Sequence, residues 1–205
     1  METYKLMYFD GYGLGEPARW LFALAGQPYE DYRFQEGEWP SVKPNTPCGQ
    51  APILVVDGKQ FSQTKAILRY LAKQFGFFAA SDWDQARGDM VADYLDDIRK
   101  PLPEIYLEKD EAKKKELLDN YMENFPKSLK NLEKILTENQ GGDGYFAGDK
   151  ITWTDVYFVC NINIFTRMLP KTLLEPFPKL KALMERVESL PAIADWIKRR
   201  PVTKA

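Results

Sequence analysis

The chain has 205 residues, of which 44% are hydrophobic, and its formal net charge is -2. This composition suits one or two compact domains, gives no basic stripe for nucleic acid, and contains no apolar run near the roughly 20 residues of a membrane helix. The absence of histidine excludes Ser-His and Cys-His nucleophile pairs, histidine general bases and most zinc sites.

Two further features concern the cellular compartment. The first residues show no cationic leader followed by an apolar core, so a cytoplasmic location is expected, with no membrane and no nucleic-acid partner. Cys48 and Cys160 are too few for a disulfide framework and lack C-x-x-C spacing, so both are expected to be free thiols.

The first element is a strand over residues 3–9, where side chains alternate in the pattern of a half-buried strand. A glycine-rich turn, 11–15, follows, and Glu16-Pro17 predicts a helix as far as about Gly26. The turn has the first two glycines of a dinucleotide-binding G-x-G-x-x-G loop. Its third glycine position is Glu16, whose carboxylate would face pyrophosphate, so a phosphate cradle is disfavoured.

The next elements complete a small mixed sheet. A second strand is predicted at 30–34, followed by an irregular loop with several prolines and then by a hairpin over 53–62. Asp57-Gly58 between two apolar runs is a strong signal for a two-residue turn. A helix over 64–75 follows, so the order is βαβ, a helical loop, then ββα, which is the thioredoxin-like arrangement without a C-x-x-C motif.

Beyond about residue 79 the sequence is helical in period. Pro101 and Pro103 should bend or end the first long helix, and a charged helix follows over 112–139. Thr152 and Asp155 form a capping box that opens a buried helix, and two short helices finish the chain. We therefore expect an α/β plus all-α fold, with a thioredoxin-like domain at 1–79 and an all-helical domain at 80–205.

Three features of the first domain could carry chemistry. Tyr8 ends the first strand, where its hydroxyl could point into a cleft, although a tyrosine there is more often part of the core or surface. Pro52 precedes a buried strand, and such prolines are often cis, which would turn the Ala51 backbone outward toward an extended ligand. A plain strand-starting proline is the alternative.

The third feature is the helix start at Gln63-Thr64, where backbone N–H groups and the helix dipole favour an anion. Thr64 could equally be a simple cap. Trp39 and Lys43, in the preceding loop, add an indole donor and a cation. Together these groups suit a small acidic peptide.

The chain resembles the cytosolic glutathione transferases nearly end to end, and most closely the sigma class. The resemblance rests on the order and spacing of five segments: YFDGYGLGEPARWLF, EWPSVKPNTPCGQAPIL, DGKQFSQTKAILRYLAKQFG, ITWTD and LPAIADWIKRRPVTK. It implies that glutathione is the co-substrate and that Tyr8 donates a hydrogen bond to the glutathione sulfur.

That hydrogen bond can account for catalysis without histidine. A free thiol has a pKa of roughly 8.5, and each unit of depression needs about 1.4 kcal/mol. A hydrogen bond to an anion contributes about 1.5–3 kcal/mol, which is enough to make the thiolate dominant near pH 7. The thiolate would then attack an electrophilic carbon or a peroxide.

The resemblance also implies which residues contact each substrate. The glutathione contacts would be Trp39 and Lys43 at the glycyl carboxylate, Gln50, Ala51 and Pro52 at the cysteinyl backbone, Gln63 and Thr64 at the γ-glutamyl carboxylate, and Asp97 of the partner subunit at the γ-glutamyl amine. The acceptor pocket would be lined by Phe9, Gly13, Leu14, Asp96, Arg99, Tyr157 and Asn161. Because one contact comes from a second subunit, a homodimer is expected.

Several positions depart from the family pattern. Tyr12 and Leu14 stand where an arginine is common, which removes a positive charge near the sulfur. Thr64 replaces a serine and Cys48 replaces an aromatic residue.

Two alternatives to a conjugating or peroxide-reducing transferase stay open. One is a glutathione-dependent isomerase of prostaglandin H to prostaglandin D. Asp93, Asp96 and Asp97 match positions that bind a divalent ion in that subset, but Leu14 and Glu104 replace its arginine and tryptophan. Carboxylates at this spacing are more often a solvated or interface face, so no metal is expected. The other alternative is a non-catalytic, crystallin-like relative, against which the complete tripeptide site argues.

Overall fold

The computed structural model describes residues 2–203, and it divides into two compact units. The first comprises the chain as far as Phe78, the segment Ile151–Cys160 and the segment from Val187 onward. The second comprises Ala79–Lys150 and Asn161–Arg186. The sequence predicted two contiguous domains, 1–79 and 80–205, and that division stays a prediction. The compact units of the structure are discontinuous in sequence.

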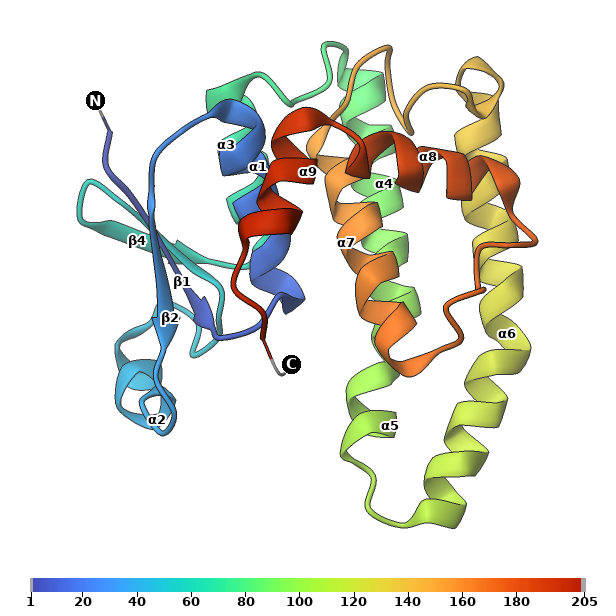
Figure 1. The fold of residues 1–205 in the computed structure, drawn as a ribbon, viewed down its shortest axis with the longest axis horizontal. Coiled ribbons are helices and arrows are strands. Elements are labelled where there is room, and N and C mark those ends of the chain that lie inside the picture. Colours follow the sequence, from blue (N-terminus) through green and yellow to red (C-terminus); the bar gives the residue numbers. More distant parts are fainter. Residues whose placement is uncertain (1, 204–205) are drawn as a thin grey trace. The chain divides into compact units, whose positions relative to one another are not determined.

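The first unit contains a four-stranded mixed sheet (Figure 1). Its strands are β1 (Tyr4–Phe9), β2 (Glu30–Phe34), β3 (Ile53–Val56) and β4 (Lys59–Ser62), in the spatial order β2-β1-β3-β4. β1 is parallel to β2 and antiparallel to β3, which pairs with β4 as a hairpin. β1 is therefore an inner strand. Of its two neighbours, β2 ends and β3 begins close to Tyr8.

The hairpin turn has the backbone that its sequence predicts. Asp57 has a φ of 47° and Gly58 a φ of 79°, so both turn residues are left-handed. A two-residue turn with positive φ at both positions matches the right-handed twist of the strands that it joins. The predicted hairpin is confirmed.

Helices cover this sheet and bury its core. The helices of the first unit include α1 (Glu16–Ala25), α2 (Trp39–Val42), α3 (Thr64–Phe75) and α9 (Pro191–Arg199), with short 3-10 turns at Gly13–Gly15 and Lys43–Asn45. Figure 1 shows α1, α3 and α9 on the same side of the sheet, and α1 contacts both of the others. Trp20, Leu21 and Ile67 are fully buried there. The thioredoxin-like part of the predicted fold is confirmed.

The second unit is helical in the residues that the structure describes. It contains α4 (Asp82–Arg99), α5 (Leu102–Leu107) and α6 (Glu111–Glu138), and it shares α7 (Trp153–Met168) and α8 (Pro178–Glu188) with the first unit. α4 ends just before Pro101, as predicted, and α6 continues through Pro126. No helix within residues 2–203 is both long and apolar enough to cross a membrane.

The start of α7 is fixed by Asp155, which is fully buried. Its Oδ2 accepts hydrogen bonds of 2.8 Å from both the Thr152 backbone N–H and the Thr152 hydroxyl. The acidic residue thus reaches back to the residue before the helix, which is one half of the predicted capping box. The bond anchors α7 and uses no group of the candidate site.

Candidate active site

Tyr8 lies near the end of β1, half-buried, with its phenol against the glycine-rich turn. Its hydroxyl oxygen accepts a hydrogen bond of 3.0 Å from the Leu14 backbone N–H. A hydroxyl can accept one hydrogen bond and donate another. A donor that points at the phenol oxygen also stabilises negative charge there, which strengthens the O–H as a donor. The geometry suits a tyrosine that donates to an anion.

Glycines allow this close approach of backbone and ring. A Cβ placed at Gly13 would lie 2.6 Å from the Tyr8 hydroxyl oxygen, and one at Gly15 would lie 2.7 Å from two ring carbons of Tyr8. Gly13 also has a φ of 36°, which side-chain-bearing residues rarely adopt. The turn that sequence reasoning rejected as a phosphate cradle is therefore a support for the phenol.

A buried ion pair lies behind the turn. Arg19 is fully buried, and its guanidinium donates to the Gly11 carbonyl at 2.7 Å, to Glu16 at 3.2 Å and to Asp31 of β2 at 2.9 Å. Its central carbon lies 5.8 Å from the centroid of the Tyr8 ring. Arg19 thus connects the turn, the start of α1 and the edge strand of the sheet.

The Glu16 carboxylate accepts hydrogen bonds from residues near both ends of the chain. Its Oε1 accepts from Trp20 at 3.0 Å, from Trp196 at 2.8 Å and from Arg200 at 2.8 Å. Burial alone would raise the pKa of this carboxyl, but the hydrogen bonds from Arg200 and Trp196 and the charges of the two arginines outweigh burial and hold the pKa below its ordinary value. Glu16 is therefore an ionised anchor of the turn.

Sequence reasoning missed this cluster. It noted Glu16 only as an obstacle to pyrophosphate. The signal that was present is local: Glu16 and Arg19 stand three residues apart on a helix whose other early residues are apolar, and a charged pair on such a buried face needs partners.

The Ala51-Pro52 peptide bond is cis, as predicted. Pro52 is buried and Ala51 is half-buried. β3 begins directly after this bond at Ile53, which pairs with Met7. The register therefore places the Ala51 backbone beside the end of β1 that carries Tyr8.

Gln63 adopts an unusual backbone conformation, with φ 80° and ψ 112°. Such conformations cost of order 1–3 kcal/mol and gather at functional sites. Its side chain is exposed and donates to the Gln50 side chain at 2.8 Å. Thr64 is the first residue of α3 and Gln63 is its N-cap residue, so the simple-cap alternative for Thr64 does not hold.

Trp39 and Phe9 extend an aromatic cluster from Tyr8. The Phe9 ring lies 5.4 Å from the Tyr8 ring and 5.2 Å from the Trp39 ring, both nearly edge to face. Lys43 follows α2 on the surface, and its stem lies near Gly49. The first unit thus brings together the predicted residues around Tyr8 (Phe9, Gly13, Leu14 and Trp39) and, separately, the pair Gln50 and Gln63.

Tyr157 and Asn161 lie on α7 and are almost completely buried. The Tyr157 ring lies 6.4 Å from the Trp153 ring. Side chains this buried touch an acceptor only if their surroundings move, and their assignment to the acceptor pocket stays a prediction.

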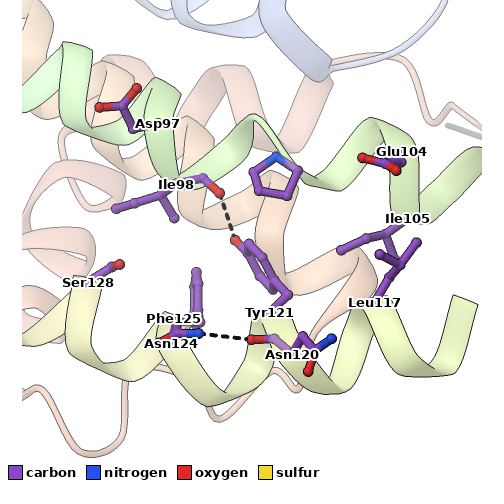
Figure 2. A pocket seen from close by; sticks show the side chains of 11 residues that line it. Asp97, Ile98, Glu104, Ile105, Leu117, Asn120, Tyr121, Asn124, Phe125 and Ser128 are labelled. Atoms are coloured by element: carbon purple, nitrogen blue, oxygen red, sulfur yellow. Dashed lines mark hydrogen bonds between the residues drawn. The ribbon is translucent and has the colours of Figure 1, made fainter.

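Asp96, Asp97 and Arg99, three of the predicted residues in the second unit, lie on α4. Asp96 and Arg99 form an ion pair of 3.0 Å. Asp97 lies at a cavity of about 380 Å³ between α4, α5 and α6, shown in Figure 2. Tyr121 and Glu104 also line this cavity, and the Tyr121 hydroxyl donates to the Ile98 carbonyl at 3.0 Å. Within residues 2–203 no three potential ligands among Cys, Asp and Glu group closely enough to hold a metal ion.

Comparison with known proteins identifies the class. The family model for the glutathione S-transferase N-terminal domain matches residues 4–73, and the model for the C-terminal domain of the same family matches residues 96–200. The chain is 40% identical to glutathione S-transferase S1 of Drosophila melanogaster over 99% of this chain and 81% of that protein. It is also 40% identical to the hematopoietic prostaglandin D synthase of Gallus gallus over 99% of both chains.

A solved structure agrees with these sequences. Prostaglandin synthase D of Nilaparvata lugens superimposes with a TM-score of 0.89 at 37% identity, covering 98% of this chain and 99% of that one. The chain therefore belongs to the glutathione S-transferase family, which is a family of enzymes. The predicted family and fold class are confirmed.

Two other relatives bear on the alternatives. The S-crystallin SL11 of Nototodarus sloanii is 38% identical over 98% of both chains. A glutathione S-transferase of Necator americanus, described as monomeric, is 37% identical with a TM-score of 0.86 and covers 99% of this chain and 100% of that one.

Proposed function

We propose that the chain conjugates the glutathione thiolate to electrophilic small molecules, with Tyr8 as the catalytic residue. One observation carries the proposal. The phenol oxygen of Tyr8 accepts from the Leu14 N–H, in a turn that packs on its ring. A phenol held in this way can donate its O–H to a thiolate at a fixed place, and a fixed donor needs no reorganisation when charge develops. The same thiolate could reduce organic hydroperoxides.

The glutathione site proposed here uses the residues named from the sequence. Gln50 and Gln63 support it because they are hydrogen-bonded to each other and because Gln63 has a strained backbone next to a helix N-terminus. Ala51, before the cis bond, supports it through its register beside β1. Trp39, Lys43 and Thr64 complete it, and no metal is required.

A pH titration of bound glutathione tests the mechanism. We expect the thiol of glutathione bound to the native chain to have a pKa about one to two units below the roughly 8.5 of a free thiol. Tyr8→Phe should return it to the free value, while Tyr106→Phe, a change at a tyrosine that is 68% exposed, should not. The readout is the ultraviolet absorbance of the thiolate. An unshifted thiol in the native protein means that the transferase mechanism is wrong.

A glutathione-dependent prostaglandin H to D isomerase is the second candidate. The relatives in Gallus gallus and Nilaparvata lugens, both named for prostaglandin D synthesis, favour it. Leu14 and Glu104 stand against it because they replace the arginine and the tryptophan of that subset. Turnover of a chlorodinitrobenzene-type acceptor, a hydroperoxide and prostaglandin H by one preparation ranks the three activities. A chain that binds no glutathione and turns over none of them would instead resemble the crystallin relative.

We also propose sigma-class membership, a cytoplasmic location and a homodimer in which Asp97 of the partner subunit holds the γ-glutamyl amine. Asp97 supports the last point because it is exposed at the end of α4. Sedimentation gives the subunit number, and a monomer, as described for the Necator americanus relative, would contradict this proposal. In a dimer, Asp97→Asn should weaken glutathione binding without shifting the thiol pKa. Cell fractionation tests the location.

A further inference from the structure

We infer that Arg200 and Pro201, which directly follow α9, position Tyr8 through the glycine-rich turn, and that Arg200 is a positioning residue for the thiol chemistry. The inference rests on the proposed function. Arg200 donates to Glu16 at 2.8 Å, and its guanidinium carbon lies 3.9 Å from the centroid of the Tyr12 ring. The Tyr12 hydroxyl donates to the Pro201 carbonyl at 3.1 Å. One short C-terminal segment thus holds the glycine-rich turn on both sides, at Tyr12 and at Glu16.

The turn in question is the one that touches the phenol. Between Tyr12 and Glu16 stand only three residues, and each meets Tyr8. The Leu14 N–H donates to the phenol oxygen, and Gly13 and Gly15 approach it too closely for a Cβ. The Glu16 N–H also donates to the Tyr12 carbonyl at 2.9 Å, which closes the turn on itself. A displacement at either end therefore moves the Leu14 donor relative to the phenol.

Arg19 and Arg200 both bond to Glu16, but they connect it to different parts of the first unit. Arg19 is fully buried and is bonded to Asp31, so it ties Glu16 to the sheet. Arg200 has a side chain that is 17% exposed and comes from the segment after α9. Without Arg200, the carboxylate keeps Arg19, Trp20 and Trp196, so the fold keeps its main anchors. The turn then loses the side-chain contact that joins the Tyr12 ring to the Glu16 carboxylate, and keeps only the backbone bond between the two residues.

Arg200 is also the planar cation of this arrangement. A guanidinium can donate to a carboxylate and lie over an aromatic face at once, whereas an ammonium is a point charge that gives up the planar contact. Arg200→Lys should therefore shift the thiol pKa of bound glutathione less than Arg200→Met does. A role limited to overall stability would show no such graded response in the thiol titration.

The neighbouring Arg199 offers a matched control. It is 59% exposed and forms an ion pair of 2.8 Å with Asp195, one helical turn away on α9. It has the same chemistry as Arg200 one residue earlier in the chain, but its guanidinium carbon lies over the Trp196 ring, 5.0 Å from the centroid, whereas that of Arg200 lies over the Tyr12 ring of the turn. Arg199→Met removes the adjacent cation at the end of α9 and should leave the thiol pKa of bound glutathione unchanged.

The experiment compares Arg200→Met, Arg200→Lys and Arg199→Met with the native chain. The thiol pKa of bound glutathione, kcat and KM with a chlorodinitrobenzene-type acceptor, and urea unfolding are measured on each. At a pH below the native thiol pKa, we expect kcat of Arg200→Met to be about 3- to 10-fold lower than that of the native chain, because one hydrogen bond to the phenol is weakened. The pH profile of kcat should shift to higher pH. KM for glutathione should stay within about twofold because no proposed glutathione contact is removed.

Each result decides the inference. If Arg200→Met keeps the native pH profile, the inference is wrong, whatever the stability of the variant. It is also wrong if Arg199→Met shifts the profile as much as Arg200→Met does. If Arg200→Met fails to fold, Tyr12→Phe, which loses the hydroxyl that bonds Pro201, decides instead. An upward shift of its profile supports the inference and a native profile overturns it. An unshifted thiol in the native chain is a different failure, because it removes the proposed function itself.

Discussion

Position 15 offers a sharp test of how tightly the turn holds Tyr8. Gly15 is buried, and a Cβ there would lie 2.7 Å from both Cγ and Cδ1 of the Tyr8 ring. Nonbonded carbons prefer about 3.5–4.0 Å, so Gly15→Ala forces the ring or the turn to move by about 0.8 Å. The bond from Leu14 to the phenol is 3.0 Å in the native chain, and a shift of that size along it would break it.

The expected losses follow from these distances. Overpacking of a filled site costs about 1–3 kcal/mol of the free energy of unfolding. A misplacement of about 1 Å in a catalytic group costs up to about 100-fold in rate. We therefore expect kcat/KM of Gly15→Ala to fall about 10- to 100-fold at a pH below the native thiol pKa, with the thiol pKa returning toward that of free glutathione.

Gly26→Ala separates the effect on the site from the effect on stability. Gly26 has a φ of 61° at the end of α1, and nothing lies within 4 Å of a Cβ placed there. This variant should lose about 1–2 kcal/mol through its left-handed backbone while keeping the native thiol titration. Urea unfolding and thiolate absorbance on both variants give the comparison. A native thiol pKa in Gly15→Ala would refute the claim that the turn fixes the phenol.

Two further predictions concern buried groups. Because the pKa of Glu16 is lowered in the folded chain, its ionised form contributes stability above its ordinary pKa of 4.5 and loses that contribution as the pH falls through the folded value. Glu16→Gln should thus cost about 3 kcal/mol in urea unfolding at neutral pH, and the difference from the native chain should shrink below pH 4.5; a difference that stays constant with pH would mean that Glu16 is not ionised in the fold. Burial raises the pKa of the Cys160 thiol well above its ordinary value, whereas Cys48 is exposed. Iodoacetamide should therefore label Cys48 alone in the native chain, as mass spectrometry would show, and early labelling of Cys160 would contradict its burial.

The elements that the sequence predicted are those set by neighbouring residues. The Asp57-Gly58 hairpin, the strand at 30–34 and the end of α4 before Pro101 all depend on backbone preferences within a few positions. The cis bond before Pro52 could be expected for the same reason. Local signals of this kind need no knowledge of the rest of the fold.

The features that sequence reasoning missed depend on distant contacts. Glu16 and Arg200 are 184 positions apart, and no periodicity or spacing relates them. The strained backbone of Gln63 was equally hidden, because glutamine has no preference for a positive φ and only the surrounding structure can hold it there. The acceptor residues on α7 were assigned by resemblance alone, which gives no information on how deeply Tyr157 and Asn161 are buried.

The loss of arginine at the turn has a different meaning once the donor to Tyr8 is known. An arginine side chain near the sulfur would add a positive charge, which Tyr12 and Leu14 do not supply. The donor seen here is the Leu14 backbone N–H, which every residue except proline supplies. The turn therefore keeps its hold on the phenol whatever the side chain at position 14. The Tyr12 side chain contacts Arg200 through its ring and Pro201 through its hydroxyl. The substitutions thus leave the main-chain donor in place, and Tyr12 supplies one of the contacts that restrain the turn.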